Sequence, residues 1–313
     1  MLYPGLYEQV INNALNRELA EIPEARKSTA PIDTAEAAKV LAQYLADVVQ
    51  KGLENVQDNG GGIEAQIQLA NQIINTIQTT TEEADFAALG VDQRAEQLLA
   101  LLQQNDPRLA TGKSAKDLDR PETSIAQSSL FTGAIHEPQM YTELKKEIVS
   151  ADRIDMLVSF IKWSGLRLIM DELQQFAQSG GELRIITTSY MGATDVKAIE
   201  ELRALSNTKI KVSYDTKRTR LHAKTYVFYR DTGFTTAYVG SSNLSNAAIS
   251  SGLEWNVKVT RKDLPETIEK IAATFESYWN SSEFEYYDEG QRERLTRALK
   301  AEKYSETDHS GIY

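Results

Sequence analysis

The feature that most constrains the fold of this chain is a change in the spacing of its apolar residues after the first third. Up to about residue 110, apolar residues recur at the spacing of amphipathic helices, with no strand-like run between them. From about residue 130 to residue 280, short apolar runs alternate with helical segments. Such alternation predicts an open sheet covered by helices on both faces. We therefore expect an α/β fold with a mixed β-sheet flanked by helices, preceded by an all-α N-terminal domain.

The same change in apolar spacing predicts the domain boundaries. Because no polar cluster interrupts the apolar faces of the N-terminal segments, a bundle that packs on itself is favoured there over a ligand-binding bundle. A polar stretch rich in Pro, Ser, Thr, Asp and Lys follows, which is typical of a linker. We predict a helical domain over 1–110, a linker over 111–129, a catalytic domain over 130–280 and a tail over 281–313 from which the chain can continue into a further domain.

Individual elements are predicted from local periodicity and from capping and turn residues. In the first domain, helical spacing covers residues 2–19, 35–49, 63–77 and 92–104. In the second domain, we expect helices over 138–150, 165–178, 195–205 and 263–279. Strands are expected over 153–160, 183–187, 209–213, 225–228, 235–239 and 253–259.

Charge and composition limit the class of protein. The net charge of −11 argues against a polyanionic partner, but residues 121–262 carry 18 basic and 15 acidic side chains, so the excess acid lies in the flanks. Cysteine is absent, which excludes disulfides, thiolate metal sites and a cysteine nucleophile. The first residues lack the pattern of a signal peptide, and no apolar run approaches bilayer-spanning length. We expect a soluble, cytoplasmic protein without membrane attachment.

Chemistry-bearing residues concentrate in the stretch 221–257. His222 and Lys224 are two apart on a predicted strand, so both side chains leave the same face. Ser241 and Asn243 follow Gly240 with the same spacing and can supply hydroxyl and amide donors. A histidine supplies both a nucleophile and a general acid near neutral pH, and cations stabilise a phosphorane. This pattern favours metal-independent phosphodiester cleavage over a structural role for a lone histidine.

The pattern resembles the phospholipase D superfamily, whose signature is H-x-K-x4-D followed by G-S-x-N and often a later glutamate. HAK at 222–224, GSSN at 240–243 and Glu254 match. The resemblance implies His222 as the nucleophile that forms a phosphohistidine and implies Lys224 and Asn243 on the phosphate oxygens. It further implies Ser241 as a supporting donor and Glu254 as the partner that orients the imidazole, with no metal or cofactor. The family's aspartate is replaced by Tyr229, and Asp231 lies two residues further on.

The family's active site uses two such motifs, and this chain has one. His136 and His309 lack a lysine two residues later, so neither begins a second copy. The resemblance therefore implies a homodimer with the active site on its two-fold axis. The flanking strings SFIKWSGLRLIMDEL and TTSYMGATD, with the helical first hundred residues, resemble the N-terminal nuclease region of bacterial superfamily 2 helicases. A helicase motor would then follow Tyr313, because these 313 residues contain no nucleotide-binding P-loop.

A basic group leads into the motif and predicts a nucleic-acid path, although a solvated loop is the alternative. It consists of Lys209, Lys211, Lys217, Arg218 and Arg220. The sequence thus predicts a nuclease that cleaves DNA, in preference to RNA, as a homodimer. The alternative is a catalytically inactive DNA-binding or dimerisation module of a larger helicase-type protein. Lipid phosphodiester transfer is disfavoured because the sequence offers no amphipathic membrane segment.

Overall fold

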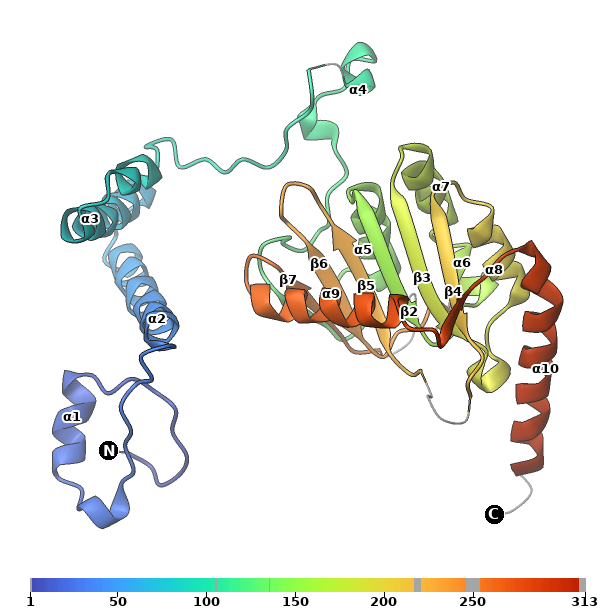
Figure 1. Cartoon of the computed structure of the whole chain (residues 1–313). Coiled ribbons are helices and arrows are strands. Elements are labelled where there is room, and N and C mark those ends of the chain that lie inside the picture. The colour runs from blue at the N-terminus through green and yellow to red at the C-terminus, as the bar shows by residue number, and fades with distance from the viewer. Residues whose placement is uncertain (1, 105, 135, 217–220, 246–253, 310–313) are drawn as a thin grey trace. The chain divides into compact units, whose positions relative to one another are not determined.

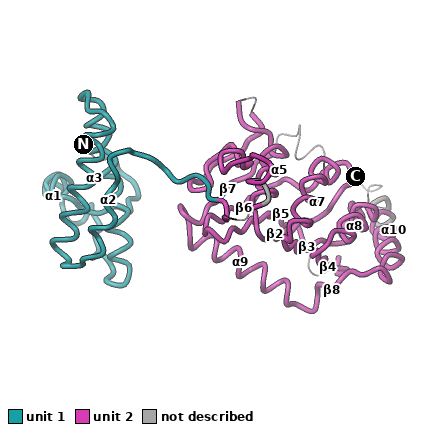
Figure 2. The backbone as a smooth tube through the Cα atoms, turned by 90° about the horizontal axis from the view of Figure 1, so that it is seen from above, with its two compact units in different colours: residues 1–101 teal, residues 102–313 magenta. Residues whose placement is uncertain are grey.

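The computed structural model divides into two compact units, residues 1–101 and residues 102–313, which Figure 1 shows as ribbons and Figure 2 in two colours. It describes residues 2–104, 106–134, 136–216, 221–245 and 254–309. No helix within these described ranges combines the length and the apolar character needed to cross a membrane. The predicted domain boundaries stay a prediction.

Unit 1 consists of helices and connecting segments. Asn12 caps the first helix, since its side-chain Oδ1 accepts hydrogen bonds from the backbone of Ala14 and Leu15 at 3.0 and 2.9 Å. Among the described residues of this unit, Ile67 is the one buried side chain. The helices are α1 (Asn13–Ala20), α2 (Ala37–Asp58) and α3 (Ile63–Thr81), with short 3-10 turns at Glu24–Arg26 and Ala84–Leu89.

The helix predicted over 92–104 is wrong, because this segment has no helical structure. Its apolar residues do recur at helical spacing, but Leu98 and Leu101 are 82% and 83% exposed. Short helices in water are marginal unless a neighbouring element covers their apolar face. The periodicity alone therefore did not suffice to form this helix.

Unit 2 is built on one eight-stranded mixed sheet (Figure 1). The strand order is β1-β7-β6-β5-β2-β3-β4-β8; β2, β3 and β4 run parallel, and every other neighbouring pair is antiparallel. This arrangement confirms the predicted fold class. The strands are β1 (Ser129–Phe131), β2 (Arg153–Val158), β3 (Glu182–Thr188), β4 (Thr208–Ser213), β5 (Lys224–Tyr229), β6 (Thr236–Gly240), β7 (Asn256–Thr260) and β8 (Phe284–Tyr286).

Helices cover both faces of the sheet. Figure 2 shows α9 along one side of the strands and α5 and α7 on the other. The larger core, on the α5 side, joins Leu144 and Leu173 to strand residues such as Met156 and Tyr226. The helices of this unit are α4 (Pro107–Ala110), α5 (Met140–Val149), α6 (Trp163–Leu166), α7 (Met170–Gln178), α8 (Val196–Arg203), α9 (Pro265–Trp279) and α10 (Arg292–His309), with 3-10 turns at Ala115–Asp117, Tyr190–Gly192 and Glu289–Gln291.

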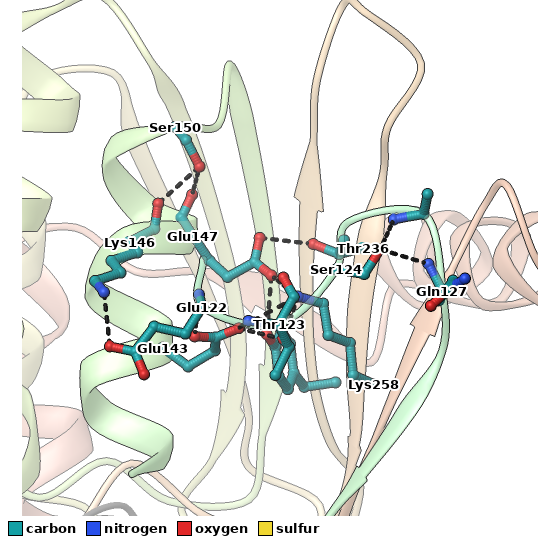
Figure 3. A network of polar contacts seen from close by, with 12 residues as sticks. Glu122, Thr123, Ser124, Gln127, Glu143, Lys146, Glu147, Ser150, Thr236 and Lys258 are labelled. Carbon is teal, nitrogen blue, oxygen red and sulfur yellow. Dashed lines mark hydrogen bonds and ion pairs between the residues drawn. The ribbon is translucent and has the colours of Figure 1, made fainter. Parts of the chain in front are cut away.

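A buried ionic network fastens α5 to the sheet (Figure 3). The Glu147 carboxylate accepts hydrogen bonds from Arg230 at 2.5 Å, from Thr236 at 2.7 Å and from the Tyr238 hydroxyl at 2.8 Å. The Lys258 ammonium lies 2.9 Å from the same carboxylate, and both side chains of this ion pair are fully buried. Burial by itself would raise the pKa of Glu147, but the charges of Arg230 and Lys258 outweigh it and hold the pKa below the ordinary value.

Part of the predicted linker and part of the predicted tail belong to this sheet structure. The Glu143 carboxylate accepts hydrogen bonds from the backbone N–H groups of Glu122 and Thr123 at 2.8 and 3.0 Å, as Figure 3 shows. Directly after these residues, β1 pairs with β7 at one edge of the sheet. At the other edge, β8 from the predicted tail pairs with β4.

Candidate active site

The three pieces of the motif meet at one end of the sheet. Lys224 begins β5 and pairs with Val158, the last residue of β2. Gly240 ends β6 and pairs with Asn256, the first residue of β7. A Cβ atom at Gly240 would lie 2.2 Å from the carbonyl oxygen of Trp255, so this close approach of the strands requires glycine. The HAK and GSSN segments and the residues after Glu254 are thereby brought side by side.

His222 and Lys224 are in direct contact. The Lys224 ammonium lies 2.9 Å from Nδ1 and 3.0 Å from Nε2 of the His222 ring, and it donates to the His222 carbonyl at 2.8 Å. His222 is exposed, whereas Lys224 is only 5% exposed. The donor and acceptor roles in this contact depend on the tautomer of the His222 ring. The contact places an exposed imidazole next to a buried cation.

The negative charge of Glu254 acts on Lys224 and Tyr226. Burial lowers the pKa of Lys224, and the negative charge of Glu254 opposes that change. Burial raises the pKa of Tyr226, and the Glu254 charge adds to it. The half-buried Glu254 is thus coupled to the β5 residues beside the histidine. Its predicted role as the orienting partner of His222 stays a prediction.

Ser241 joins the ends of β6 and β7. Its hydroxyl donates to the Trp255 carbonyl at 3.4 Å and accepts from the Trp255 N–H at 3.2 Å. The Ser241 N–H also donates to that carbonyl at 3.1 Å. Ser241 is exposed, so its hydroxyl lies at the surface of the site. In this structure it holds the strand ends together, which is compatible with the supporting role that the resemblance implies.

Asn243 is buried and points towards the end of β2. Its Oδ1 accepts a hydrogen bond from the Phe160 N–H at 3.2 Å, which fixes the amide plane. The Lys162 N–H donates to the Leu244 carbonyl at 2.8 Å, so the backbone after Asn243 is anchored too. With the oxygen committed to the backbone, the NH2 end of the amide is the part that supplies donors.

Three residues that support the site could not be identified from the sequence: Asn256, Ser242 and Tyr226. Asn256 donates from Nδ2 to the Ser242 hydroxyl at 2.7 Å, and both side chains are buried. The Tyr226 hydroxyl donates to the Ser242 carbonyl at 3.0 Å. These contacts fix the GSSN segment from two neighbouring strands. No local pattern reveals them, because they depend on strand register.

The predicted basic path is only partly within the described structure. Lys211 is buried, and its ammonium donates to the Trp279 carbonyl at 2.6 Å under α9, so it does not belong to a surface path. Lys209 is exposed near the opposite end of β4 from the site and lies 3.5 Å from Glu182. The remaining predicted cations, Lys217, Arg218 and Arg220, lie outside the described residues.

Tyr229, which replaces the family's aspartate, lies far from the histidine. It ends β5 and pairs with Arg153 at the start of β2, whereas Lys224 pairs with the last residue of β2. The Arg153 guanidinium lies 3.9 Å from the centroid of the Tyr229 ring. Burial is the main cause that raises the pKa of Tyr229 to about 12. This departure from the family pattern therefore leaves the contacts around His222 unchanged.

Part of the chain matches a known family. Residues 144–279 match the family model described as "Cardiolipin synthase, PLD-like domain". Among solved structures, NucT from Helicobacter pylori is similar at 22% identity with a TM-score of 0.39, covering 48% of this chain and 94% of that protein. The phospholipase D family member Nuc from Salmonella typhimurium is similar at 22% identity with a TM-score of 0.40, covering 51% and 99%. A search of curated protein sequences gave no match.

The matched segment contains His222, Lys224, Ser241, Asn243 and Glu254, the residues that the sequence resemblance pointed to. The structure brings His222 into contact with Lys224 and couples Lys224 to Glu254, while Ser241 and Asn243 are fixed by the neighbouring backbone. Residues 144–279, which contain this site, are therefore similar to the PLD-like domains of the phospholipase D superfamily.

Proposed function

We propose that this chain is a metal-independent phosphodiesterase that cleaves DNA through a covalent phosphohistidine on His222. The observation that carries the proposal is the pair formed by an exposed imidazole and a buried ammonium 2.9 Å from its ring. The lone pair of the imidazole can attack phosphorus, and the ammonium can bind the phosphate oxygens. Both groups start from β5 and the residues before it, so their spacing is fixed by the sheet.

The reaction takes two steps. In the first step, a ring nitrogen of His222 bonds to phosphorus, the bond to the leaving oxygen breaks, and a second histidine protonates that oxygen. In the second step, the same second histidine takes a proton from water, and the hydroxide displaces the imidazole from phosphorus. Lys224 and the Asn243 amide donate to the non-bridging oxygens and offset the negative charge that develops on them.

The second histidine requires a second copy of the chain, since the sequence holds one H-x-K motif. A homodimer with a two-fold axis through the site supplies His222 from each copy. Light scattering at micromolar concentration tests this arrangement. A protein that is monomeric and fully active contradicts it.

DNA is the proposed substrate because of the sequence around the motif. The flanking strings resemble the nuclease region of superfamily 2 helicases, and three cations at 217, 218 and 220 precede His222 directly. Cations beside a cleavage site bind the phosphate backbone without sequence preference. A helicase motor after Tyr313 is part of the same proposal.

A gel assay on labelled single- and double-stranded DNA with EDTA present tests the function. The wild-type protein should cleave, His222→Asn should bind without cleaving, and His136→Asn should cleave like wild type. Loss of all cleavage on adding EDTA contradicts the mechanism. Binding without cleavage by both wild type and His222→Asn supports instead a catalytically inactive DNA-binding module.

A further inference from the structure

A groove opens directly beside His222, on the α9 side of the motif. Its volume is about 520 Å³, and its walls come from the end of α9 and the turn before β8 as well as from the residues around the histidine. The lining residues from α9 and the turn before β8 include Ser277, Tyr278, Ser281 and Glu283. A substrate bound to His222 through its phosphate therefore has space for one of its two substituents in this groove.

Tyr278 gives the groove an aromatic wall. Its side chain is 37% exposed, and its ring centroid lies 5.8 Å from that of Phe284 at an interplanar angle of 34°. Phe284 also lines the groove, is only 4% exposed and packs in the core under α9, so its contact supports the tyrosine ring. A braced, half-exposed aromatic ring is the platform on which a nucleobase stacks, and such stacking does not depend on base identity.

The charge of the groove favours a base over a phosphate. Among the described residues that line it, Glu283 is the one carboxylate, and none is a lysine or an arginine. The Ser213 hydroxyl donates to the Glu283 carboxylate at 3.3 Å. A smaller pocket of about 390 Å³ continues from Ser281 and Glu283 to Asp215 and Glu285. Carboxylates repel phosphate and accept hydrogen bonds from the N–H groups of bases.

We propose that this groove is a base-binding subsite in which Tyr278 stacks on the nucleobase adjacent to the scissile phosphate. This proposal rests on the proposed phosphodiesterase activity and adds which part of the substrate lies on which side of His222. Tyr278 acts by binding a group that does not react, so its removal should weaken substrate binding without slowing the chemical step on a substrate that has no base.

The test compares substrates that share a leaving group and differ in whether a thymidine is attached to the phosphate, and through which of its oxygens. We would measure kcat and KM of the full chain for thymidine 5′-(p-nitrophenyl phosphate), its 3′ isomer and methyl p-nitrophenyl phosphate. For wild type, one thymidine ester should have a KM about tenfold below that of the methyl ester, as expected for one stacked base. Tyr278→Ala should remove this difference and leave the methyl ester unaffected, whereas Tyr278→Phe should retain it.

Phe234→Ala is the matched control, because Phe234 is a partly exposed aromatic residue in the β5–β6 turn, at the opposite end of the sheet from His222. It should keep the preference for the thymidine ester. Equal KM values for the three esters in wild type, or an undiminished preference in Tyr278→Ala, overturn the subsite while the phosphodiesterase stands. Failure of wild type to cleave any ester contradicts the proposed function and the subsite with it.

Discussion

The ammonium of Lys224 lies 2.9 Å from Nδ1 and 3.0 Å from Nε2 of His222, almost equally far from both ring nitrogens. In the proposed mechanism the attacking nitrogen and the phosphate are adjacent, so the same cation that contacts the ring in the free protein would bind a phosphate oxygen during the reaction.

Lys224→Met should lower kcat by about 100- to 1000-fold, the usual effect of removing a group that stabilises the transition state. The same change should raise the melting temperature, because a buried cation is replaced by an apolar side chain of similar length. Kinetic assays and thermal unfolding would measure the two effects. Lys209→Met, at an exposed position, is the control and should alter neither. A Lys224→Met protein with wild-type kcat would exclude a role in catalysis.

The activity should decline at a lower alkaline pH than it would if Lys224 had the ordinary pKa of a lysine. Burial lowers the pKa of Lys224 below 10.5, so the cation is lost as pH rises through that lowered value. Glu254→Gln removes the opposing negative charge and should move the alkaline limb of kcat/KM to still lower pH. A pH–rate profile of both proteins measures this shift, and an alkaline limb that moves upward in Glu254→Gln contradicts the coupling.

Tyr229→Asp, which restores the family's residue, should not increase kcat. Tyr229 lies at the far end of β5, and its ring packs against the Arg153 guanidinium at 3.9 Å. An aspartate there would lose this packing and place a second carboxylate near Asp155, so the melting temperature should fall. A clear gain in kcat for the folded variant would show that the tyrosine weakens the chemistry.

Glu147→Gln should lower the free energy of unfolding by about 3–5 kcal/mol, because it leaves buried cations without a counter-charge. Glu285→Gln is the matched control; this partly exposed carboxylate also pairs with an arginine at 2.5 Å, and its loss should cost about 0–1 kcal/mol. Urea unfolding at neutral pH measures both values. Equal losses in the two variants would show that the buried network adds no stability.

The same network should make the wild-type protein sensitive to acid. The pKa of Glu147 is lower in the folded protein than its ordinary value of 4.5. Its contribution to stability is therefore fully present above about pH 4.5 and is lost as pH falls from there through the lowered pKa. In this pH range the stability of Glu147→Gln should decrease less than that of wild type. Parallel pH dependence in the two proteins would contradict the assignment.

The sequence predicted the central elements of the sheet well, because buried strands are continuous apolar runs and the helices between them are amphipathic. The edge strands β1 and β8 were missed, since three residues are too few to show a period. The segment 92–104 shows the reverse case. Its apolar residues recur at helical spacing, but Leu98 and Leu101 are exposed and the segment is not helical. Local pattern thus predicts an element only where packing later supports it.

The site was predictable to the extent that its residues lie close together in sequence. His222 and Lys224 share a strand and its approach, so their contact follows from local spacing. Asn256 and Tyr226 support the site through the pairing of neighbouring strands, which the sequence does not reveal. Lys211 was misassigned because a basic residue on a strand next to an aromatic helix can be buried under that helix.

The hydrogen bonds from Glu122 and Thr123 to Glu143 bear on how this domain can be moved between proteins. A truncated protein or a gene fusion that begins at residue 130 would remove two backbone donors from a carboxylate that is completely buried. The portable unit therefore starts at or before Glu122.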